Sequence, residues 1–199
     1  MKVLIITSSF LPKKGGAEFA VHNLASRFLS FGNKTTVLNA VSGFSEGSYD
    51  VEKYLIIKGS RYYGYHRFPI KQFEQWQIRK RIEKHSPDII MAHFGWPVGM
   101  WVGTMGLDIP FSITCHGPAL NITPRGPRAR YKYKIDPLLA RSMNNSVAAV
   151  AISGHAKEIM LDIGVKEEKI VRIPNGVDVG KFSIISAFNL REHFGLPKE

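Results

Sequence analysis

Short apolar runs alternate with amphipathic segments along most of the chain. Val3-Leu4-Ile5-Ile6 lies between Lys2 and Thr7, which predicts a short strand buried on both faces. Comparable runs predict further strands at residues 35–40, 54–57, 88–92, 111–115, 147–152 and 170–173. Amphipathic segments predict helices at residues 15–32, 72–85, 97–106, 134–144 and 153–164. This alternation predicts an α/β fold, a doubly wound parallel sheet of about seven strands with helices on both faces.

Two helix boundaries carry specific signals. Gly32 follows the apolar positions of the first helix, and a glycine there favours a helix end in the left-handed conformation. Ser153 precedes the last of the predicted helices. Its hydroxyl can accept a hydrogen bond from the backbone N–H groups of the first turn, so we expect it to cap that helix.

Polar residues and glycines stand at the ends of several predicted strands. Ligands of parallel α/β sheets bind at the carboxyl ends of the strands. In this chain those ends carry Thr7-Ser8-Ser9 followed by Gly15-Gly16, then His93, His116-Gly117 and Ser153. The sequence therefore places a ligand site at this edge of the sheet.

The glycines of the loop TSSFLPKKGGAE have two interpretations. The loop lacks the glycine patterns of dinucleotide-binding and P-loop enzymes. Gly15 and Gly16 nevertheless leave backbone N–H groups bare at the positive end of a helix dipole, which suits a phosphate. Alternatively, they only permit a tight turn into the helix.

Two histidines are candidates for chemistry. From the end of a buried strand, and before Gly117, His116 can hydrogen-bond a sugar hydroxyl or exchange a proton near neutral pH. His93 has the same placement with less support from its surroundings. Each could instead be a packing histidine. No histidine pair has metal-ligand spacing, so no metal site is predicted.

The single cysteine, Cys115, excludes an intrachain disulfide and fits a reducing cytosol. Its side chain is expected to point into the core. The first apolar run is too short for a signal peptide, and no run approaches the roughly 18 residues of a membrane span. We therefore expect a cytoplasmic protein that is soluble or peripheral at the inner face of the membrane.

Positive charge is concentrated in two windows. The net charge is +11, and residues 53–85 contribute +7 while residues 125–134 contribute +5. Such windows attract phosphates of lipids, nucleotides or nucleic acids, although ordinary solubilising charge is the alternative. We expect residues 58–81 and 125–134 to flank the acceptor mouth and to hold an anionic, lipid-phosphate-linked acceptor at an anionic membrane surface. The acceptor-side residues predicted from them are Arg79, Lys80, Arg81, Arg125 and Arg128.

Three segments together resemble the N-terminal half of a family-4 (group 1) glycosyltransferase with the GT-B fold. They are MKVLIITSSFLPKKGGAE, then TCHG, then VAISGHAKEIMLDIGV with KIVRIPNGVDVGKF, in this order over residues 1–182. The resemblance implies two facing Rossmann-like domains with the active site between them. It further implies a retaining, metal-independent transfer of a sugar from a nucleotide sugar, as in polysaccharide biosynthesis, with no other cofactor.

The resemblance also assigns roles to residues of this chain. Gly15 and Gly16 match the loop near the donor diphosphate, and His116 matches the catalytic histidine near the transferred sugar. The acceptor side includes His93 and Gly117. The turn between the two domains matches Asn175, Gly176 and Asp178.

The resemblance implies that the chain is one half of an enzyme. Residues 1–182 would form the acceptor-side domain, and residues 183–199 the linker and start of a C-terminal domain that binds most of the nucleotide sugar. The glutamate pair of that second domain has no counterpart here, so the 199-residue chain alone is expected to be inactive. The expected partners are a nucleotide sugar, a glycan, lipid-linked or small-molecule acceptor, and the C-terminal domain in cis.

Two other classes remain open on the sequence. The net charge and the aromatics among basic residues, such as Phe68 and Trp76, would suit a nucleic-acid-binding module, although no nucleic acid partner is expected. A Rossmann-type oxidoreductase is the other class. The missing glycine pattern disfavours it, as does Asn39, which stands where such enzymes usually place an acid.

Overall fold

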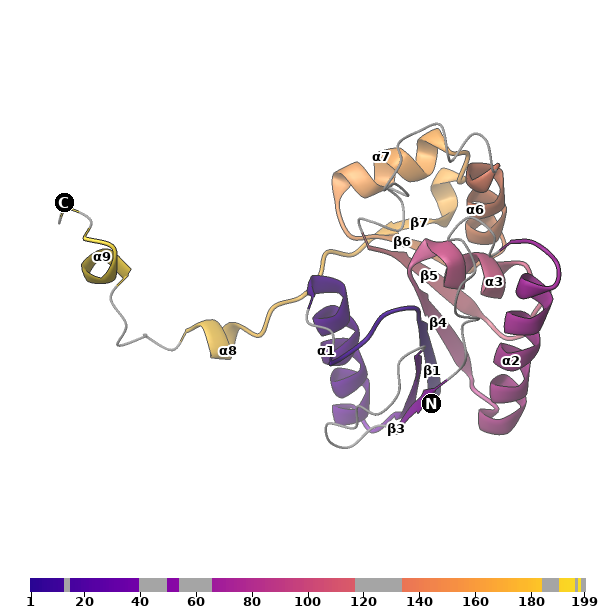
Figure 1. The fold of residues 1–199 in the computed structure, drawn as a ribbon, viewed down its shortest axis with the longest axis horizontal. Helices are drawn as coiled ribbons and strands as arrows, with labels where there is room; N and C mark the ends of the chain where they lie inside the picture. Colours follow the sequence, from indigo (N-terminus) through magenta and orange to yellow (C-terminus); the bar gives the residue numbers. More distant parts are fainter. Residues whose placement is uncertain are drawn as a thin grey trace.

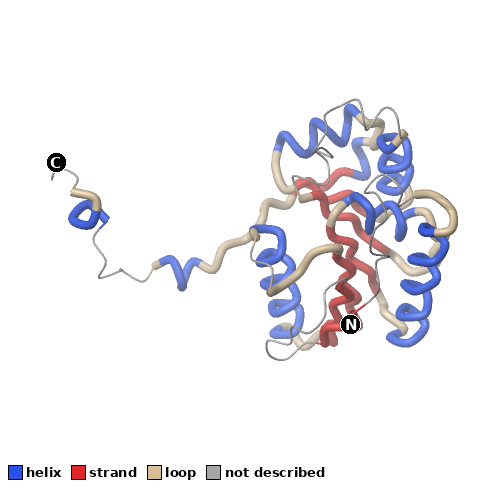
Figure 2. Tube along the Cα trace, viewed as in Figure 1, coloured by secondary structure: helices blue, strands red, loops and turns tan. Residues whose placement is uncertain are grey.

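The computed structural model describes residues 1–12, 15–39, 50–53, 66–116, 134–183, 190–195 and 197. A parallel sheet forms its central layer (Figure 2). Its seven strands have the order β3-β2-β1-β4-β5-β6-β7. The strands are β1 (Lys2–Thr7), β2 (Lys34–Asn39), β3 (Asp50–Lys53), β4 (Ile89–His93), β5 (Phe111–Cys115), β6 (Ala148–Ala151) and β7 (Ile170–Arg172). The predicted fold class, a doubly wound α/β sheet, is confirmed.

The chain reverses its direction across the sheet between β1 and β4. Strands β1 to β3 are added in one direction, and β4 to β7 are added in the other. In such sheets the crevice for a ligand lies at the carboxyl ends of the strands beside this reversal. The loops that follow Thr7 in β1 and His93 in β4 border this crevice.

Helices cover both faces of the sheet (Figure 1). One face packs against α1 (Gly16–Ser30), with Val3 and Ile5 of β1 in that core. The other face, with Leu4 and Ile6, belongs to the core beneath the remaining helices of the domain. These are α2 (Ile70–His85), the irregular turn η2 (Gly95–Gly99), α3 (Met100–Gly103), α6 (Ile135–Asn144) and α7 (Gly154–Asp162). Among the described residues, α1 is therefore the one helix on its face.

Most predicted elements are confirmed, one is corrected, and one lies outside the described residues. The third strand lies at Asp50–Lys53, whereas the predicted residues 54–57 are outside the described residues. This strand was missed because it is a polar edge strand, which needs only Val51 packed against the core. The predicted helix at 97–106 is shorter, because α3 ends at Gly103, and it is preceded by the irregular turn η2, in which Trp96 is extended.

Both helix boundary signals are confirmed. Gly32 has φ of +76°, the left-handed conformation expected after α1. The Ser153 hydroxyl accepts a hydrogen bond from the backbone N–H of Ala156 at 3.1 Å, which satisfies one open donor of the first turn of α7.

The last part of the chain leaves the sheet. A short 3₁₀ turn, η3 (Glu167–Lys169), leads into β7, and residues 173–178, the crossing segment, follow it. The helices α8 (Val179–Phe182) and α9 (Leu190–His193) then extend away from the sheet (Figure 1). No helix in the described part of the chain combines the length and apolar character needed to cross a membrane.

Candidate functional site

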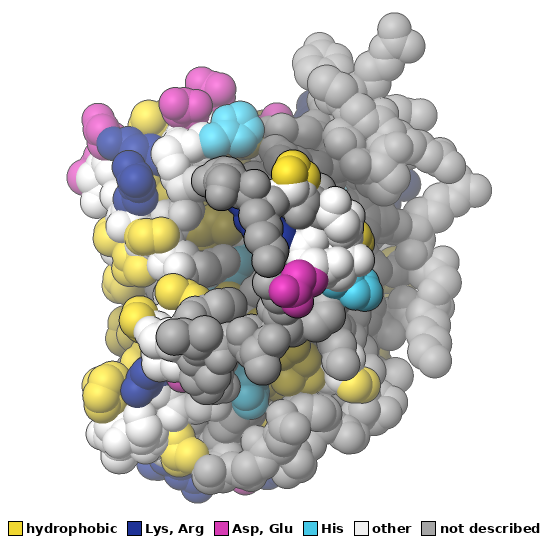
Figure 3. Space-filling model, turned by 90° about the vertical axis from the view of Figure 1, so that its left-hand side faces the viewer, with side chains coloured by type: hydrophobic (Ala, Val, Ile, Leu, Met, Phe, Trp, Pro, Cys, Tyr) yellow, Lys and Arg dark blue, Asp and Glu magenta, His cyan; other side chains and the backbone are white. Residues whose placement is uncertain are grey.

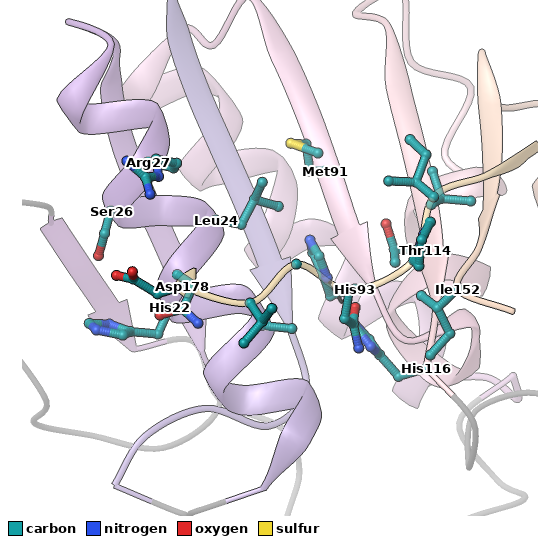
Figure 4. Close-up of a pocket in the computed structure, with 18 of the residues that line it drawn as sticks. His22, Leu24, Ser26, Arg27, Met91, His93, Thr114, His116, Ile152 and Asp178 are labelled. Atoms are coloured by element: carbon teal, nitrogen blue, oxygen red, sulfur yellow. Dashed lines mark hydrogen bonds between the residues drawn. The ribbon is translucent and has the colours of Figure 1, made fainter. Parts of the chain in front are cut away.

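A cavity of about 700 Å³ lies on the α1 side of the sheet (Figure 4). Its walls are α1, the strands β4, β5 and β6, and the crossing segment. Figure 3 views the molecule from the side on which α1 lies in Figure 1, and hydrophobic and histidine side chains are visible there. The predicted location of a ligand site, at the carboxyl ends of the strands, thus coincides with a cavity.

Four buried polar residues form a row across the carboxyl end of the sheet. Asn39 of β2, Thr7 of β1, His93 of β4 and Thr114 of β5 are register partners in turn, so their side chains lie on the same face. This is the α1 face, and His93 and Thr114 line the cavity. Buried polar groups in such a row need hydrogen-bond partners, and a ligand can supply those that the protein lacks.

His93 and His116 are in direct contact. Nδ1 of His93 lies 3.0 Å from Nε2 of His116, and the two rings are nearly parallel with centroids 5.3 Å apart. Their side chains are 3% and 2% exposed. The sequence placed both at strand ends, but only the register of β4 against β5 brings them into one pair.

Burial keeps this pair neutral. The pKa of His93 is lowered to about 3, first by burial and second by the charge of His116. Burial also lowers the pKa of His116, while the carboxylate of Glu18 opposes that shift. Neutral imidazoles each have one N–H donor and one bare nitrogen, so the pair can both donate to a ligand and accept from it.

Phe94 supports the pair from its other side. Its ring centroid is 5.3 Å from that of His116, and its backbone N–H donates to Thr114 O at 2.9 Å. The φ of Phe94 is +74°, a strained value for a residue with a side chain. The backbone is therefore strained immediately after His93, at the residue whose ring contacts His116.

The sequence analysis missed Glu18, whose carboxylate is near enough to His116 to influence its pKa. It is buried in the first turn of α1 and accepts a hydrogen bond from the Ser9 hydroxyl. A Cβ on Gly15 would overlap its carboxylate, whereas a Cβ on Gly16 would meet nothing within 4 Å. Gly15 thus has a packing reason to be glycine. The role of both glycines near a phosphate stays a prediction.

Helix α1 supplies a polar wall that the sequence analysis also missed. His22, Ser26 and Ser30 recur every four residues along the helix, so they share one face. Arg27 lines the same cavity. The sequence signal that could have indicated this wall is the row of polar residues beside the apolar face of α1.

The crossing segment closes the cavity opposite the sheet. Asn175, Gly176 and Asp178, predicted as a turn between domains, all line the cavity and are exposed on their outer side. These residues follow Ile173, whose backbone N–H donates a hydrogen bond to Ala151 O at 2.9 Å and so attaches the start of the crossing segment to the end of β6. Their role as an interdomain turn stays a prediction.

The basic residues predicted on the acceptor side are not brought to this cavity. Arg79, Lys80 and Arg81 lie in the second half of α2, on the face opposite α1. Arg79 donates to Met105 O at 3.0 Å, Arg81 donates to Gln77 O at 3.2 Å, and Lys80 pairs with Glu83 at 3.4 Å.

Three other predicted residues, Gly117, Arg125 and Arg128, lie outside the described residues. The expected position of Cys115 is confirmed, since it is fully buried. Burial raises the pKa of its thiol to about 12.

The chain belongs to Glycosyltransferase Family 4, whose sequence pattern matches residues 14–181. The resemblance inferred from the three sequence segments is thereby confirmed. A search of curated protein sequences found no match.

Solved structures of glycosyltransferases share the fold. HepE of Anabaena, crystallised in complex with UDP-glucose, has a TM-score of 0.70 at 17% identity over 98% of this chain and 50% of its own. A sucrose-phosphate synthase of Thermosynechococcus elongatus has a TM-score of 0.67 at 15% identity over 98% and 53%. A glycosyltransferase of Rickettsia africae has 0.64 at 19% over 99% and 50%. The chain therefore spans about half the length of these structures, consistent with one half of a GT-B fold.

Proposed function

We propose that this chain is the acceptor-side half of a retaining, metal-independent glycosyltransferase that uses a nucleotide sugar. The observation that carries the proposal is the cavity at the carboxyl ends of the strands, lined by the His93–His116 pair, in a member of Glycosyltransferase Family 4. The UDP-glucose and UDP bound to Anabaena HepE support the nucleotide-sugar class of donor. The acceptor is a glycan, a lipid-linked glycan or a small molecule.

The proposed roles follow from position. His116 holds an oxygen of the transferred sugar, because it lies at the strand ends where a second domain would face the sheet. Gly15 and Gly16 lie at the amino end of α1, where backbone N–H groups and the helix dipole favour the donor diphosphate. His93 acts on the acceptor side through its contact with His116.

We further propose that residues 1–182 form the acceptor-side domain and that residues 183–199 lead into a nucleotide-sugar-binding domain. The exposed apolar side chains of Ile173 and Val177 support this, because they lie beside the cavity without burial in the described structure. Groups from both walls of a cleft are needed to orient donor and acceptor. The isolated chain is therefore inactive in this proposal.

Transfer assays on two forms of the protein test the proposal. Purified chain 1–199 should show negligible turnover with UDP-glucose, and the same chain followed by a nucleotide-sugar-binding domain should be active. In the active form, His116→Ala should lower turnover by about 100-fold, the loss of one hydrogen bond to a reacting sugar. His155→Ala, on the exposed face of α7, is the control. Robust transfer by chain 1–199, or wild-type turnover of His116→Ala, contradicts the proposal.

A surface on α2 supports a second proposal, that the protein binds peripherally at the inner face of an anionic membrane in the cytoplasm. Phe68, which precedes α2, is 81% exposed, and Phe73 and Trp76 of α2 are 40% and 55% exposed, while Glu74 and Gln77 of the same helix are buried. The Phe73 and Trp76 rings lie 6.0 Å apart. Aromatic rings favour the lipid–water boundary, so these exposed rings fit a membrane surface better than water.

Basic residues accompany this aromatic surface. Lys80 and Lys84 are exposed on later turns of α2, where each contributes about 1 kcal/mol near an anionic bilayer. Lys80 pairs with Glu83 and Lys84 pairs with Glu52, and these carboxylates offset part of the attraction.

Vesicle sedimentation tests the membrane proposal. Phosphatidylglycerol vesicles should bind the protein more than phosphatidylcholine vesicles, and Trp76→Ser or Lys80→Gln should weaken the binding. Phe31→Ser removes an exposed phenylalanine at the end of α1 and is the matched control, because α1 lies on the opposite face. Equal binding to both vesicles, or equal losses in Trp76→Ser and Phe31→Ser, contradicts the proposal.

A further inference from the structure

The His93–His116 contact restricts where the two histidines hold their protons. A nitrogen–nitrogen distance of 3.0 Å is a hydrogen bond, which needs one proton between Nδ1 of His93 and Nε2 of His116. Two neutral imidazoles carry two N–H protons in total. The second proton must therefore sit on an outer nitrogen, either Nε2 of His93 or Nδ1 of His116. Each choice fixes the tautomer of both rings at once.

Both outer nitrogens are buried and have no hydrogen-bond partner among the described residues. A buried N–H without an acceptor is less tolerable than a bare acceptor nitrogen, so the outer proton should be at the end that a ligand can reach. His93 is held inside the sheet, between Thr7 of β1 and Thr114 of β5. His116 follows the end of β5 and so lies beyond the strands, although both histidines line the cavity. The outer proton therefore belongs on His116.

Charge near the pair favours the same choice. Burial lowers the pKa of His116, and the negative charge of Glu18 is the opposing influence. A carboxylate near a buried imidazole stabilises positive partial charge on that ring. His93, in contrast, has the neutral side chains of Thr7 and Thr114 as its neighbours in the row.

We propose that His93 is a positioning residue whose Nδ1–H donates to Nε2 of His116 and so holds His116 as the Nδ1–H tautomer. In this state His116 presents one hydrogen-bond donor, at a defined atom, to an oxygen of the ligand. Its other nitrogen is occupied by His93, so His116 is a donor to a sugar oxygen and not a general base. The link to a sugar rests on the proposed transferase function, whereas the proton assignment does not.

The surrounding packing supports a fixed ring orientation. The His116 ring is nearly parallel to the His93 ring, at an interplanar angle of 19°, and meets the Phe94 ring at 54°, with both centroid distances 5.3 Å. A ring flip of His116 would put carbon atoms in place of Nε2 and Nδ1, and so would break the contact that Nε2 makes with His93. Phe94 is itself fixed by its backbone hydrogen bond to Thr114.

Nitrogen NMR of the 199-residue chain tests the assignment directly. In a two-bond ¹H–¹⁵N spectrum near pH 7, protonated and bare ring nitrogens differ strongly in chemical shift. We expect Nδ1–H and bare Nε2 for both His93 and His116, although free histidine favours the Nε2–H form. An Nε2–H signal for His116 in the wild-type protein would overturn the proposal without any variant.

Substitutions of His93 test the positioning role. His93→Phe removes the donor and should lower the ratio of Nδ1–H to Nε2–H in His116 about fivefold or more, the effect of one net hydrogen bond. His93→Asn keeps an amide donor at the place of Nδ1 and should retain the wild-type pattern. Met91→Leu alters packing two residues earlier in the same strand and is the control.

The outcomes separate this proposal from the proposed function. An unchanged His116 tautomer in His93→Phe overturns the positioning role, and if that variant does not fold, the wild-type spectrum and His93→Asn decide. Absence of sugar transfer would contradict the transferase proposal and leave the NMR result intact. Conversely, an active enzyme with His116 as the Nε2–H tautomer would overturn the role of His93 alone.

Discussion

Acidification should destabilise this protein through His93, well before its carboxylates titrate. The folded-state pKa of His93 is about 3, lowered first by burial and then by His116. In the unfolded chain a histidine has a pKa of about 6.5. Between these values the unfolded state binds more protons than the native state, so the free energy of unfolding decreases as the pH falls. The stabilisation is complete above about pH 6.5 and is lost progressively towards pH 3.

The magnitude follows from the same two values. At pH 5 the solution is about 1.5 units below the unfolded pKa and still above the folded one. At about 1.36 kcal/mol per unit, His93 alone should cost about 2 kcal/mol of stability between pH 7 and pH 5. For a domain of this size, about 2 kcal/mol corresponds to a decrease in Tm of about 4–8 °C. The lowered pKa of His116 acts in the same direction.

Urea denaturation at pH 7 and pH 5 measures this loss. His93→Asn should reduce the loss by about 2 kcal/mol, because an amide does not titrate. Comparing two pH values within each variant cancels the packing cost of the substitution. Met91→Leu, which lines the same cavity, should keep the full wild-type loss. If His93→Asn loses as much stability as wild type between the two pH values, the buried neutral His93 cannot be the cause.

Three further outcomes are expected from the structure. In urea denaturation, Gly15→Ala should lower the free energy of unfolding by about 1 kcal/mol, because the added Cβ displaces the Glu18 carboxylate. Gly16→Ala has open space around it, so its free energy of unfolding should be unchanged or slightly higher. Gly103→Ala should cost about 3 kcal/mol, because its Cβ would overlap the backbone of α6; a Tm equal to wild type would show that α3 and α6 can separate. Cys115, fully buried with a pKa of about 12, should resist alkylation by iodoacetamide in the native state and react on unfolding; rapid native labelling would contradict its burial.

The sequence by itself determined the fold class and the edge of the sheet that carries the site. Continuous apolar runs such as Val3–Ile6 are typical of strands covered on both sides, and amphipathic segments between them require parallel crossovers. These are local patterns, and a residue that follows a strand must lie at its carboxyl end. For that reason His93 and His116 could be assigned to the site before the structure was known.

Only the tertiary structure decided how those residues act on one another. The hydrogen bond from ring to ring depends on the register of β4 against β5, and the contact of Glu18 with Ser9 depends on how α1 folds back onto the loop after β1. For the basic residue Arg79, the sequence prediction was not met, because a cluster of charges along the sequence does not specify on which side of the sheet each side chain lies. The Arg79 guanidinium donates a hydrogen bond to Met105 O, on the face of the sheet opposite α1. Distances between side chains that are remote in sequence depend on the packing of the whole sheet, which no local pattern encodes.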